Sequence, residues 1–311
     1  MKTISTARLT NIILSCVLVL TLVFGWFFFR NQDPVELISS KLPQNALPSA
    51  TYLFSIYGSN SRTLKGPNFV TVFQNEIYVS DSQNGVVRVF DYNGDYQREF
   101  GKGQLGVPKS IVFYNKEIYV VDINKNAVKV FDREGKWLRD WVKAARPTDL
   151  LIKDDTFYLL DAASHQILVC DSKGNIKKLI GKKGRKQGEL YFPSSILIDD
   201  DNQIWVADSN NNRIQVFDSN GKLVKIYSQE DGGFLVPRGI SFDAKGYLYV
   251  ANAVGNYVTI HDAKGRKVNE IRTAENKNDK LAIPNKTFID QNRRLYVAEI
   301  SKNRVSVFAI K

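Results

Sequence analysis

The chain has 311 residues, with 43 Lys and Arg against 32 Asp and Glu, so its formal net charge is +11. Hydrophobic residues make up 43% and charged residues 24%, a balance that is typical of globular domains and excludes general disorder. Two Cys exclude a disulfide-stapled scaffold, and two His leave little for metal or acid–base chemistry.

The first apolar segment predicts a membrane anchor. Residues 12–29 form a run without a charge that is long enough to cross a bilayer core. Lys2 and Arg8 precede the run, which favours a cytoplasmic amino terminus. The run ends in aromatic residues from Trp26 onward, whereas a cleaved signal peptide would end in small residues. We therefore expect a single-pass cell-membrane protein with a short cytoplasmic tail at 1–11 and an extracytoplasmic remainder.

A linker and then a series of repeats follow the anchor. Residues 30–50 contain three Pro and no sustained pattern, so they are interpreted as a stalk. From 51 to 311 the sequence repeats, and each unit opens with a proline, at 67, 108, 147, 193, 237 and 284. After each proline come a short apolar run, a turn, a second run, a further turn and a third run.

The second and third runs are the most regular parts of the repeat. The second reads EIYVSD, EIYVVD, TFYLLD, QIWVAD, YLYVAN and RLYVAE, and the third reads VVRVFD, AVKVFD, QILVCD, RIQVFD, YVTIHD and RVSVFA. Both are rich in β-branched and aromatic residues and too short for helices. A fourth run follows in five units, and Asp-x-x-Gly after the third run suits a type I turn between antiparallel strands.

Four short strands in units of this length predict an all-β, six-bladed β-propeller with four-stranded antiparallel blades, preceded by one transmembrane helix. The sixth unit ends at Lys311 without a fourth run. Residues 51–57 resemble the fourth runs, so we expect them to form the outer strand of the sixth blade. This pairing would close the ring and remove an open sheet edge.

The repeats resemble those of the NHL-repeat propellers, over residues 67–311. The fourth unit matches the family's pattern nearly throughout Ile204–Gly221. There are departures, because the Gly after Pro-x survives only as Gly239 and the Arg of the turn only as Arg213 and Arg304. The resemblance implies a membrane-anchored, bacterial-type NHL propeller but no single activity, because the fold hosts many functions.

Most chemistry-bearing residues have a structural explanation in the repeat. His165 aligns with turn positions held by Gly or Asn elsewhere, which predicts a left-handed backbone. His261 and Cys170 occupy a position that is Phe in four units, so we interpret both as core residues. Asp199, Asp200 and Asp201 fall in a turn between two strands, which favours a solvated turn over an ion site.

Some six-bladed relatives are metal enzymes, which implies an alternative function. Lyases of this kind use several His around zinc, and lactonase-like propellers hold calcium with Glu, Asn and Asp. Neither ligand set can be assigned to positions of this sequence. We expect no cofactor, and calcium is the ion that the enzymatic alternative would need. No nucleic acid partner is expected outside the membrane, so the recurring aromatic column is interpreted as blade packing.

Recognition is expected on the face that carries the longer loops. The loop before each proline and the loop after the second strand lie at the same end of a blade. GKKGRKQG at 181–188 is the most basic of these loops, and Lys102, Lys143 and Arg146 lie in neighbouring ones. The candidate binding residues are the four cations of this loop, Lys182, Lys183, Arg185 and Lys186, and the residues that follow the prolines, Asn68, Lys109, Thr148, Ser194, Arg238 and Asn285.

These observations predict a membrane-anchored extracytoplasmic binding or scaffolding module that engages a protein or an anionic polymer or ligand on its loop-rich face. Two alternatives remain open. One is a divalent-metal-dependent hydrolytic enzyme of the lactonase or lyase type at the central channel. The other is an extracytoplasmic sensor domain that signals through a separate partner.

Overall fold

The computed structural model describes residues 47–59, 62–228 and 233–311, of which Pro48–Lys311 form one compact unit. The predicted tail at 1–11, the anchor at 12–29 and most of the 30–50 linker lie outside the described residues. Within the described residues, no helix is long and apolar enough to cross a membrane.

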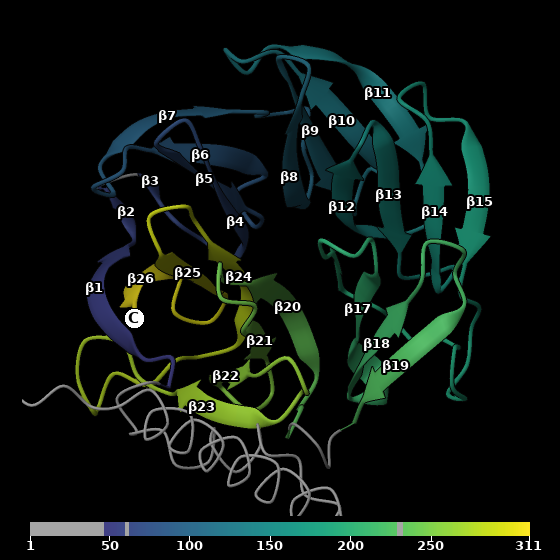
Figure 1. The fold of residues 1–311 in the computed structure, drawn as a ribbon. Helices are drawn as coiled ribbons and strands as arrows, with labels where there is room; N and C mark the ends of the chain where they lie inside the picture. The colour runs from purple at the N-terminus through teal and green to yellow at the C-terminus, as the bar shows by residue number, and fades with distance from the viewer. Residues whose placement is uncertain (1–46, 60–61, 229–232) are drawn as a thin grey trace, which may run out of the picture. The chain divides into compact units, whose positions relative to one another are not determined.

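The described residues contain six four-stranded antiparallel sheets, arranged as blades around a ring (Figure 1). In blades one to five, chain order runs from the inner strand outward. Blade one comprises β4 (Pro67–Phe73), β5 (Glu76–Asp81), β6 (Val86–Phe90) and β7 (Tyr96–Phe100). Blade two comprises β8 (Pro108–Tyr114), β9 (Glu117–Asp122), β10 (Ala127–Phe131) and β11 (Trp137–Lys143). Blade three comprises β12 (Pro147–Lys153), β13 (Thr156–Asp161), β14 (Gln166–Cys170) and β15 (Ile176–Ile180).

The remaining blades follow the same plan, with one short helical turn. Blade four comprises β16 (Ser195–Ile198), β17 (Ile204–Asp208), β18 (Arg213–Phe217) and β19 (Leu223–Tyr227), with the 3-10 turn η2 (Ser209–Asn211) after β17. Blade five comprises β20 (Pro237–Phe242), β21 (Leu248–Asn252), β22 (Tyr257–His261) and β23 (Lys267–Ile271). Blade six comprises β24 (Pro284–Ile289), β25 (Arg294–Glu299), β26 (Arg304–Ile310) and β1 (Ala50–Ile56). A hairpin of β2 (Gly58–Ser59) and β3 (Arg62–Thr63) links β1 to blade one.

Sequence-distant strands close the ring in blade six. β1 pairs antiparallel with β26, from Ala50 opposite Ile310 to Ile56 opposite Val305. Ile56 is buried in a cluster shared by blades one and six. The predicted closure is therefore confirmed, although the strand spans 50–56 rather than 51–57. Figure 1 shows β1 at the outer edge of the blade that holds the carboxyl terminus.

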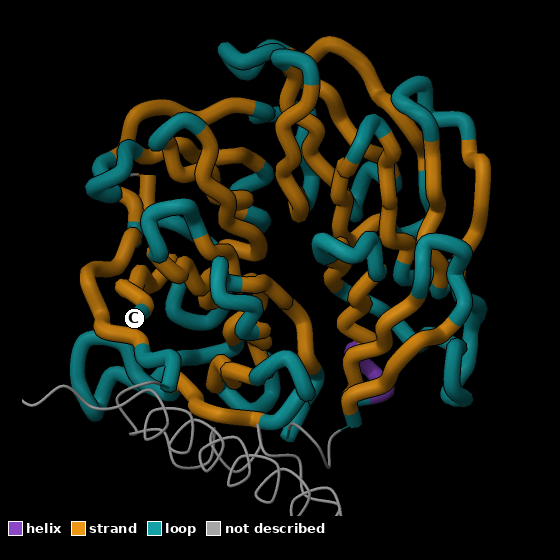
Figure 2. The backbone as a smooth tube through the Cα atoms, in the orientation of Figure 1, coloured by secondary structure: helices purple, strands orange, loops and turns teal. Residues whose placement is uncertain are grey.

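Loops and strands alternate regularly around the ring (Figure 2). The Asp-x-x-Gly turns close as predicted, and in blade one the Gly94 N–H donates to the Asp91 carbonyl at 3.0 Å. The second and third strands of each blade are largely buried on both faces, because they pack between neighbouring blades. Their β-branched and aromatic residues are the side chains that fit such a surface.

The two histidines and the described cysteine have the structural positions that the repeat predicts. His165 has a φ of 58°, and its Nδ1 accepts a hydrogen bond from the Phe192 N–H at 3.0 Å. His261 is fully buried, and burial lowers its pKa to about 4. Cys170 is also buried, and burial raises the pKa of its thiol to about 11. The stretch Asp199–Asn202 forms the predicted turn between β16 and β17.

Candidate functional site

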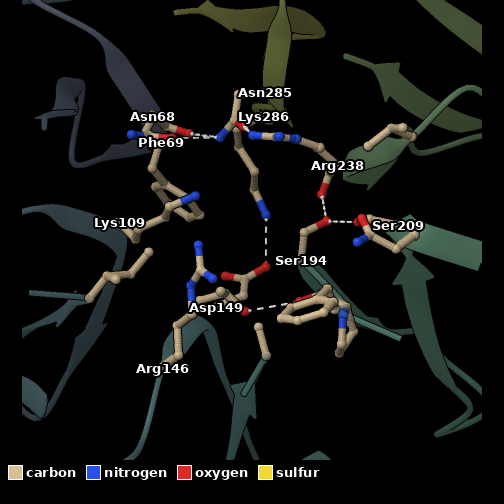
Figure 3. A pocket seen from close by; sticks show the side chains of 17 residues that line it. Asn68, Phe69, Lys109, Arg146, Asp149, Ser194, Ser209, Arg238, Asn285 and Lys286 are labelled. Atoms are coloured by element: carbon tan, nitrogen blue, oxygen red, sulfur yellow. Dashed lines mark hydrogen bonds and ion pairs between the residues drawn. The ribbon is translucent and has the colours of Figure 1, made fainter. Parts of the chain in front are cut away.

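A pocket opens at the mouth of the ring, where the inner strands begin (Figure 3). Its cavity volume is about 360 Å³. Loop residues such as Ile123, Ala162 and Asn210, which follow second strands, line the same pocket. The predicted clustering of these loops with the strand beginnings is therefore confirmed. All six candidates that follow the prolines line it: Asn68, Lys109, Thr148, Ser194, Arg238 and Asn285.

A backbone irregularity explains why further residues reach the pocket. Strict alternation would turn the residue two positions after each proline away from its predecessor. In five blades the pairing of the first and second strands shifts register just after the proline, for example between Pro147 and Asp149 and between Pro284 and Lys286. Such a bulge re-aims a side chain. Phe69, Asp149 and Lys286 consequently line the pocket beside their predecessors.

An ion pair from opposite blades forms the floor of the pocket. Lys286 of blade six lies with its Nζ 3.2 Å from Asp149 Oδ2 of blade three and 3.1 Å from Ser195 Oγ. The Asp149 carboxylate also accepts from Ser195 Oγ at 2.8 Å and from the Ile196 N–H at 3.1 Å. Both ionic side chains are almost buried, and the Lys286 ammonium lies 4.6 Å from the centre of the Phe69 ring. The pair spans the channel and leaves Asp149 with its charge neutralised.

Three further cations lie above this floor, each from a different blade: Lys109 from blade two, Arg146 from blade three and Arg238 from blade five. Among the described residues that line the pocket, Asp149 is the one carboxylate. The pKa of Lys109 is lowered to about 8, chiefly by burial and also by the charges of Arg238, Arg146 and Lys286, while Asp149 opposes the shift. Burial and Arg146 also lower the pKa of Arg238. The pocket therefore holds an uncompensated positive charge.

The three cations differ in whether another side chain of the protein already accepts a hydrogen bond from them. Arg238 Nη1 donates to Asn285 Oδ1 at 3.1 Å, and Asn285 Nδ2 donates to the Asn68 carbonyl at 2.7 Å. The Lys109 ammonium and the Arg146 guanidinium have no acceptor within the part of the chain that the structure describes, and Figure 3 shows both directed into the pocket. These two groups are free to bind an anion.

The hydroxyl groups at the rim of the pocket form hydrogen bonds within the protein. Ser194 Oγ lies 2.6 Å from Ser209 Oγ and donates to the Arg238 carbonyl at 2.8 Å. Thr148 Oγ1 donates to the carbonyls of Leu160 and Pro193, at 3.3 Å each. The bonds to the Arg238 and Pro193 carbonyls join neighbouring blades, and the other two lie within blades four and three.

The basic loop at 181–188 is organised separately from the pocket. None of its four candidates lines the pocket. Lys182 Nζ lies 3.6 Å from Glu189 Oε1, and the Arg185 guanidinium lies 5.2 Å from the centre of the Tyr191 ring. Arg213, which the repeat pattern singles out, donates to the carbonyls of Lys186 and Glu189, both at 2.7 Å, and fixes the loop. Lys182, Lys183, Arg185 and Lys186 are exposed.

The sequence analysis did not identify the pocket residues that enter the pocket through the bulge or through a contact between distant parts of the chain. Asp149 and Lys286 are 137 positions apart and were not among the candidates. Arg146 was expected only as part of the basic loops. The signal that was available is the residue two positions after each proline, which is charged in just these two of the six units.

The pocket offers cationic and amide donors for an anion rather than a set of metal ligands. Among the described residues, no group of three or more His, Cys, Asp or Glu side chains is placed to hold a metal ion. The single carboxylate of the pocket, Asp149, already accepts from Lys286, Ser195 and the Ile196 backbone. The arrangement can bind and orient a negatively charged group.

Comparison with known proteins identifies the fold. The family DUF5128, described as 6-bladed beta-propeller, matches residues 139–311. No match was found among curated proteins. Among solved structures, virginiamycin B lyase from Staphylococcus aureus has a TM-score of 0.62 at 13% identity, covering 85% of this chain and 99% of that one.

Two further structures show the same likeness. A streptogramin B lyase has a TM-score of 0.59 at 14% identity and covers 85% of this chain and 98% of its own. A protein of unknown function from Bacteroides thetaiotaomicron has a TM-score of 0.68 at 12% identity, covering 85% of this chain and 77% of that one. At these identities the likeness shows the fold alone.

Proposed function

This chain belongs to the 6-bladed beta-propeller family, and from that premise and the pocket at its channel mouth we propose that it is a binding module for an anionic partner. The observation that carries the proposal is the convergence of Lys109, Arg146 and Arg238 above the neutral pair of Lys286 and Asp149. Like charges held together cost free energy, and an anion between them offsets that cost.

The rest of the loop-rich face supports an extended anionic partner. The exposed cations of loop 181–188 lie in the connection that leads into β16, and Pro193 and Ser194 at the end of that connection line the pocket. Arg213 and Glu189 hold this loop in place, so its charges are presented with little ordering cost on binding. The proposed partner is thus a protein with an acidic surface, an anionic polymer or an anionic ligand, and this face is where it docks.

The proposed setting is the outer side of a cell membrane. The apolar run at 12–29 is the proposed single-pass anchor, with the amino terminus in the cytoplasm and the propeller outside. The NHL-type assignment is proposed on the match of Ile204–Gly221 to that repeat. A fusion of a reporter to each end of the full chain, tested for accessibility in intact cells, would measure the orientation. An accessible amino terminus would contradict it.

A polyanion titration tests the binding function. The full-length chain in detergent micelles would be titrated into labelled poly-L-glutamate and followed by fluorescence polarisation. Replacing the four loop cations by Glu, together with Arg146→Gln, should weaken binding at least tenfold and flatten its salt dependence. The matched control reverses four exposed lysines at the opposite ends of the blades: Lys136, Lys173, Lys222 and Lys245.

The control decides between a docking face and general attraction. If it binds like the unmodified chain, the loop-rich face is the docking site. Equal weakening by both sets of substitutions would mean that the basic chain attracts polyanions without a site, which contradicts the proposal.

A further inference from the structure

The geometry at the channel mouth points to a specific ligand: we propose that the pocket binds the phosphoryl group of a small phosphate monoester between Lys109, Arg146 and Arg238. This inference rests on the proposed function, because it names the chemistry of the anion that the site accepts. Figure 3 shows the three side chains entering the pocket from different sides.

The number and directions of the cations favour a phosphoryl group over a carboxylate. A carboxylate has two oxygens in one plane, and a single guanidinium is enough to pair with both. A phosphate monoester has three terminal oxygens arranged around phosphorus and a charge between −1.5 and −2 at neutral pH. Such a group can accept from three cations that approach from three blades, and its charge offsets up to two of the three positive charges that remain after Asp149 has paired with Lys286.

The floor explains how an anion is tolerated beside a carboxylate. Asp149 is held by Lys286 Nζ at 3.2 Å, by Ser195 Oγ and by the Ile196 N–H. Its charge is therefore compensated before any ligand arrives. If Asp149 were substituted, Lys286 would carry an unpaired charge in the floor and would attract the ligand. Because Asp149 pairs with Lys286, the ligand is left to the three cations at the rim.

The other residues that line the pocket indicate which kind of organic group the ligand carries. Phe69, Phe192 and Val236 contribute apolar surface, and Asn68 contributes an amide. The cavity volume of about 360 Å³ falls at the lower end of the range for small-molecule pockets. A compact, hydroxylated ester fits this mixture better than a long chain does. A phosphodiester, such as the backbone linkage of a phosphate polymer or the headgroup linkage of many lipids, carries one charge, which matches the three cations less well.

Proton linkage distinguishes binding at this site from binding elsewhere. Lys109 faces Arg238, Arg146, Lys286 and Asp149, and its pKa is lowered to about 8. A bound dianion favours the protonated ammonium, so binding at pH 8 should take up about half a proton per site. Affinity should fall above pH 8 as Lys109 loses its proton and below about pH 6 as the phosphate gains one.

Calorimetric titration of the full-length chain in detergent micelles tests the inference. The probes are glycerol 3-phosphate, inorganic phosphate, a glycerophosphodiester and succinate, at pH 7. Glycerol 3-phosphate should bind with one site per chain and more tightly than the diester or succinate. Arg146→Gln and Arg238→Gln should each weaken it at least tenfold, whereas Lys245→Gln, which removes an exposed charge at the opposite end of a blade, should leave it unchanged. At pH 8 the binding enthalpy should vary with the ionisation enthalpy of the buffer, and Lys109→Met should abolish that variation.

Each other outcome has a definite meaning. Succinate binding as tightly as the monoester, with the same dependence on Arg146 and Arg238, would overturn the phosphoryl assignment and leave the anion-binding module intact. Tighter binding of the diester would overturn the monoester in favour of a polymer or lipid source, and binding of inorganic phosphate alone would overturn the ester. If no probe binds while poly-L-glutamate does, the inference fails and the proposed function stands. If none of these anions binds, both fail.

Discussion

Ring closure by β1 makes a sharp prediction about stability. Ile56 lies in β1, is 2% exposed and packs in a cluster with residues of blades one and six, whereas Leu53 of the same strand is 42% exposed. Truncating a buried Ile to Ala costs about 2–5 kcal/mol, while surface truncations stay within about 0.5 kcal/mol. For a domain of this size, 1 kcal/mol shifts the Tm by roughly 2–4 °C. Ile56→Ala should therefore lower the Tm by roughly 4–20 °C, and Leu53→Ala by roughly 2 °C or less.

Thermal unfolding of the full-length chain, followed by circular dichroism of the strand signal, measures the difference. The two substitutions sit three residues apart in the same closing strand, so they differ in burial and not in position along the chain. Equal shifts, or a shift below about 2 °C for Ile56→Ala, would refute the reasoning that β1 locks the ring by burying its inward face.

Three further predictions concern buried groups. Asp149→Asn leaves Lys286 without its partner in the channel floor and should lower stability by about 3–5 kcal/mol in denaturant unfolding, and a change below 1 kcal/mol would contradict the buried pair. His261 is neutral in the fold with a pKa of about 4 against an ordinary 6.5, so the unfolded chain binds the proton first and stability falls as pH drops from 6.5 to 4. His261→Phe should remove that loss, which is about 3 kcal/mol, and an unchanged pH profile would contradict this. Cys170 should resist thiol reagents until the propeller unfolds, as peptide mapping after alkylation would show, and rapid labelling at neutral pH would contradict its burial.

The architecture could be predicted because the repeat encodes it many times over. Each blade repeats the same strand pattern, so an error in one unit is corrected by the others. The closure followed from two local facts, namely that the last unit lacks a fourth strand and that residues near 51–57 resemble one. The left-handed backbone of His165 followed in the same way, because Asn and Gly hold the equivalent positions.

The pocket could be predicted only in part, because it depends on contacts across the ring. The residues after the prolines were identified, since strand order alone places them at one end of the channel. The bulge that brings Lys286 beside its predecessor shifts the pairing of one strand and has no residue signature in the repeat. The pair of Lys286 and Asp149 joins opposite blades, which no local pattern reports.

An arginine of blade one shows the same limit of prediction from a local sequence pattern. The turn Arg of the repeat is absent from that unit, yet Arg88, two positions further along β6, donates from its Nε to Asp81 Oδ2 at 2.6 Å. Arg213 and Arg304 make the corresponding contacts from the expected position. The interaction is retained while its position in the sequence has moved, because neighbouring side chains on one strand face can reach the same carboxylate.

Locating a bound tetrahedral dianion would test the central claim most directly, namely that the channel mouth is an anion-binding site. Selenate carries two charges, and its selenium scatters anomalously, so diffraction from crystals of the chain grown with selenate would show where it binds. The strongest anomalous peak should lie among Lys109, Arg146 and Arg238, within hydrogen-bonding distance of at least two of them, and it should vanish in Arg146→Gln. Selenate bound only on the outer loops, with the channel mouth empty, would contradict the account.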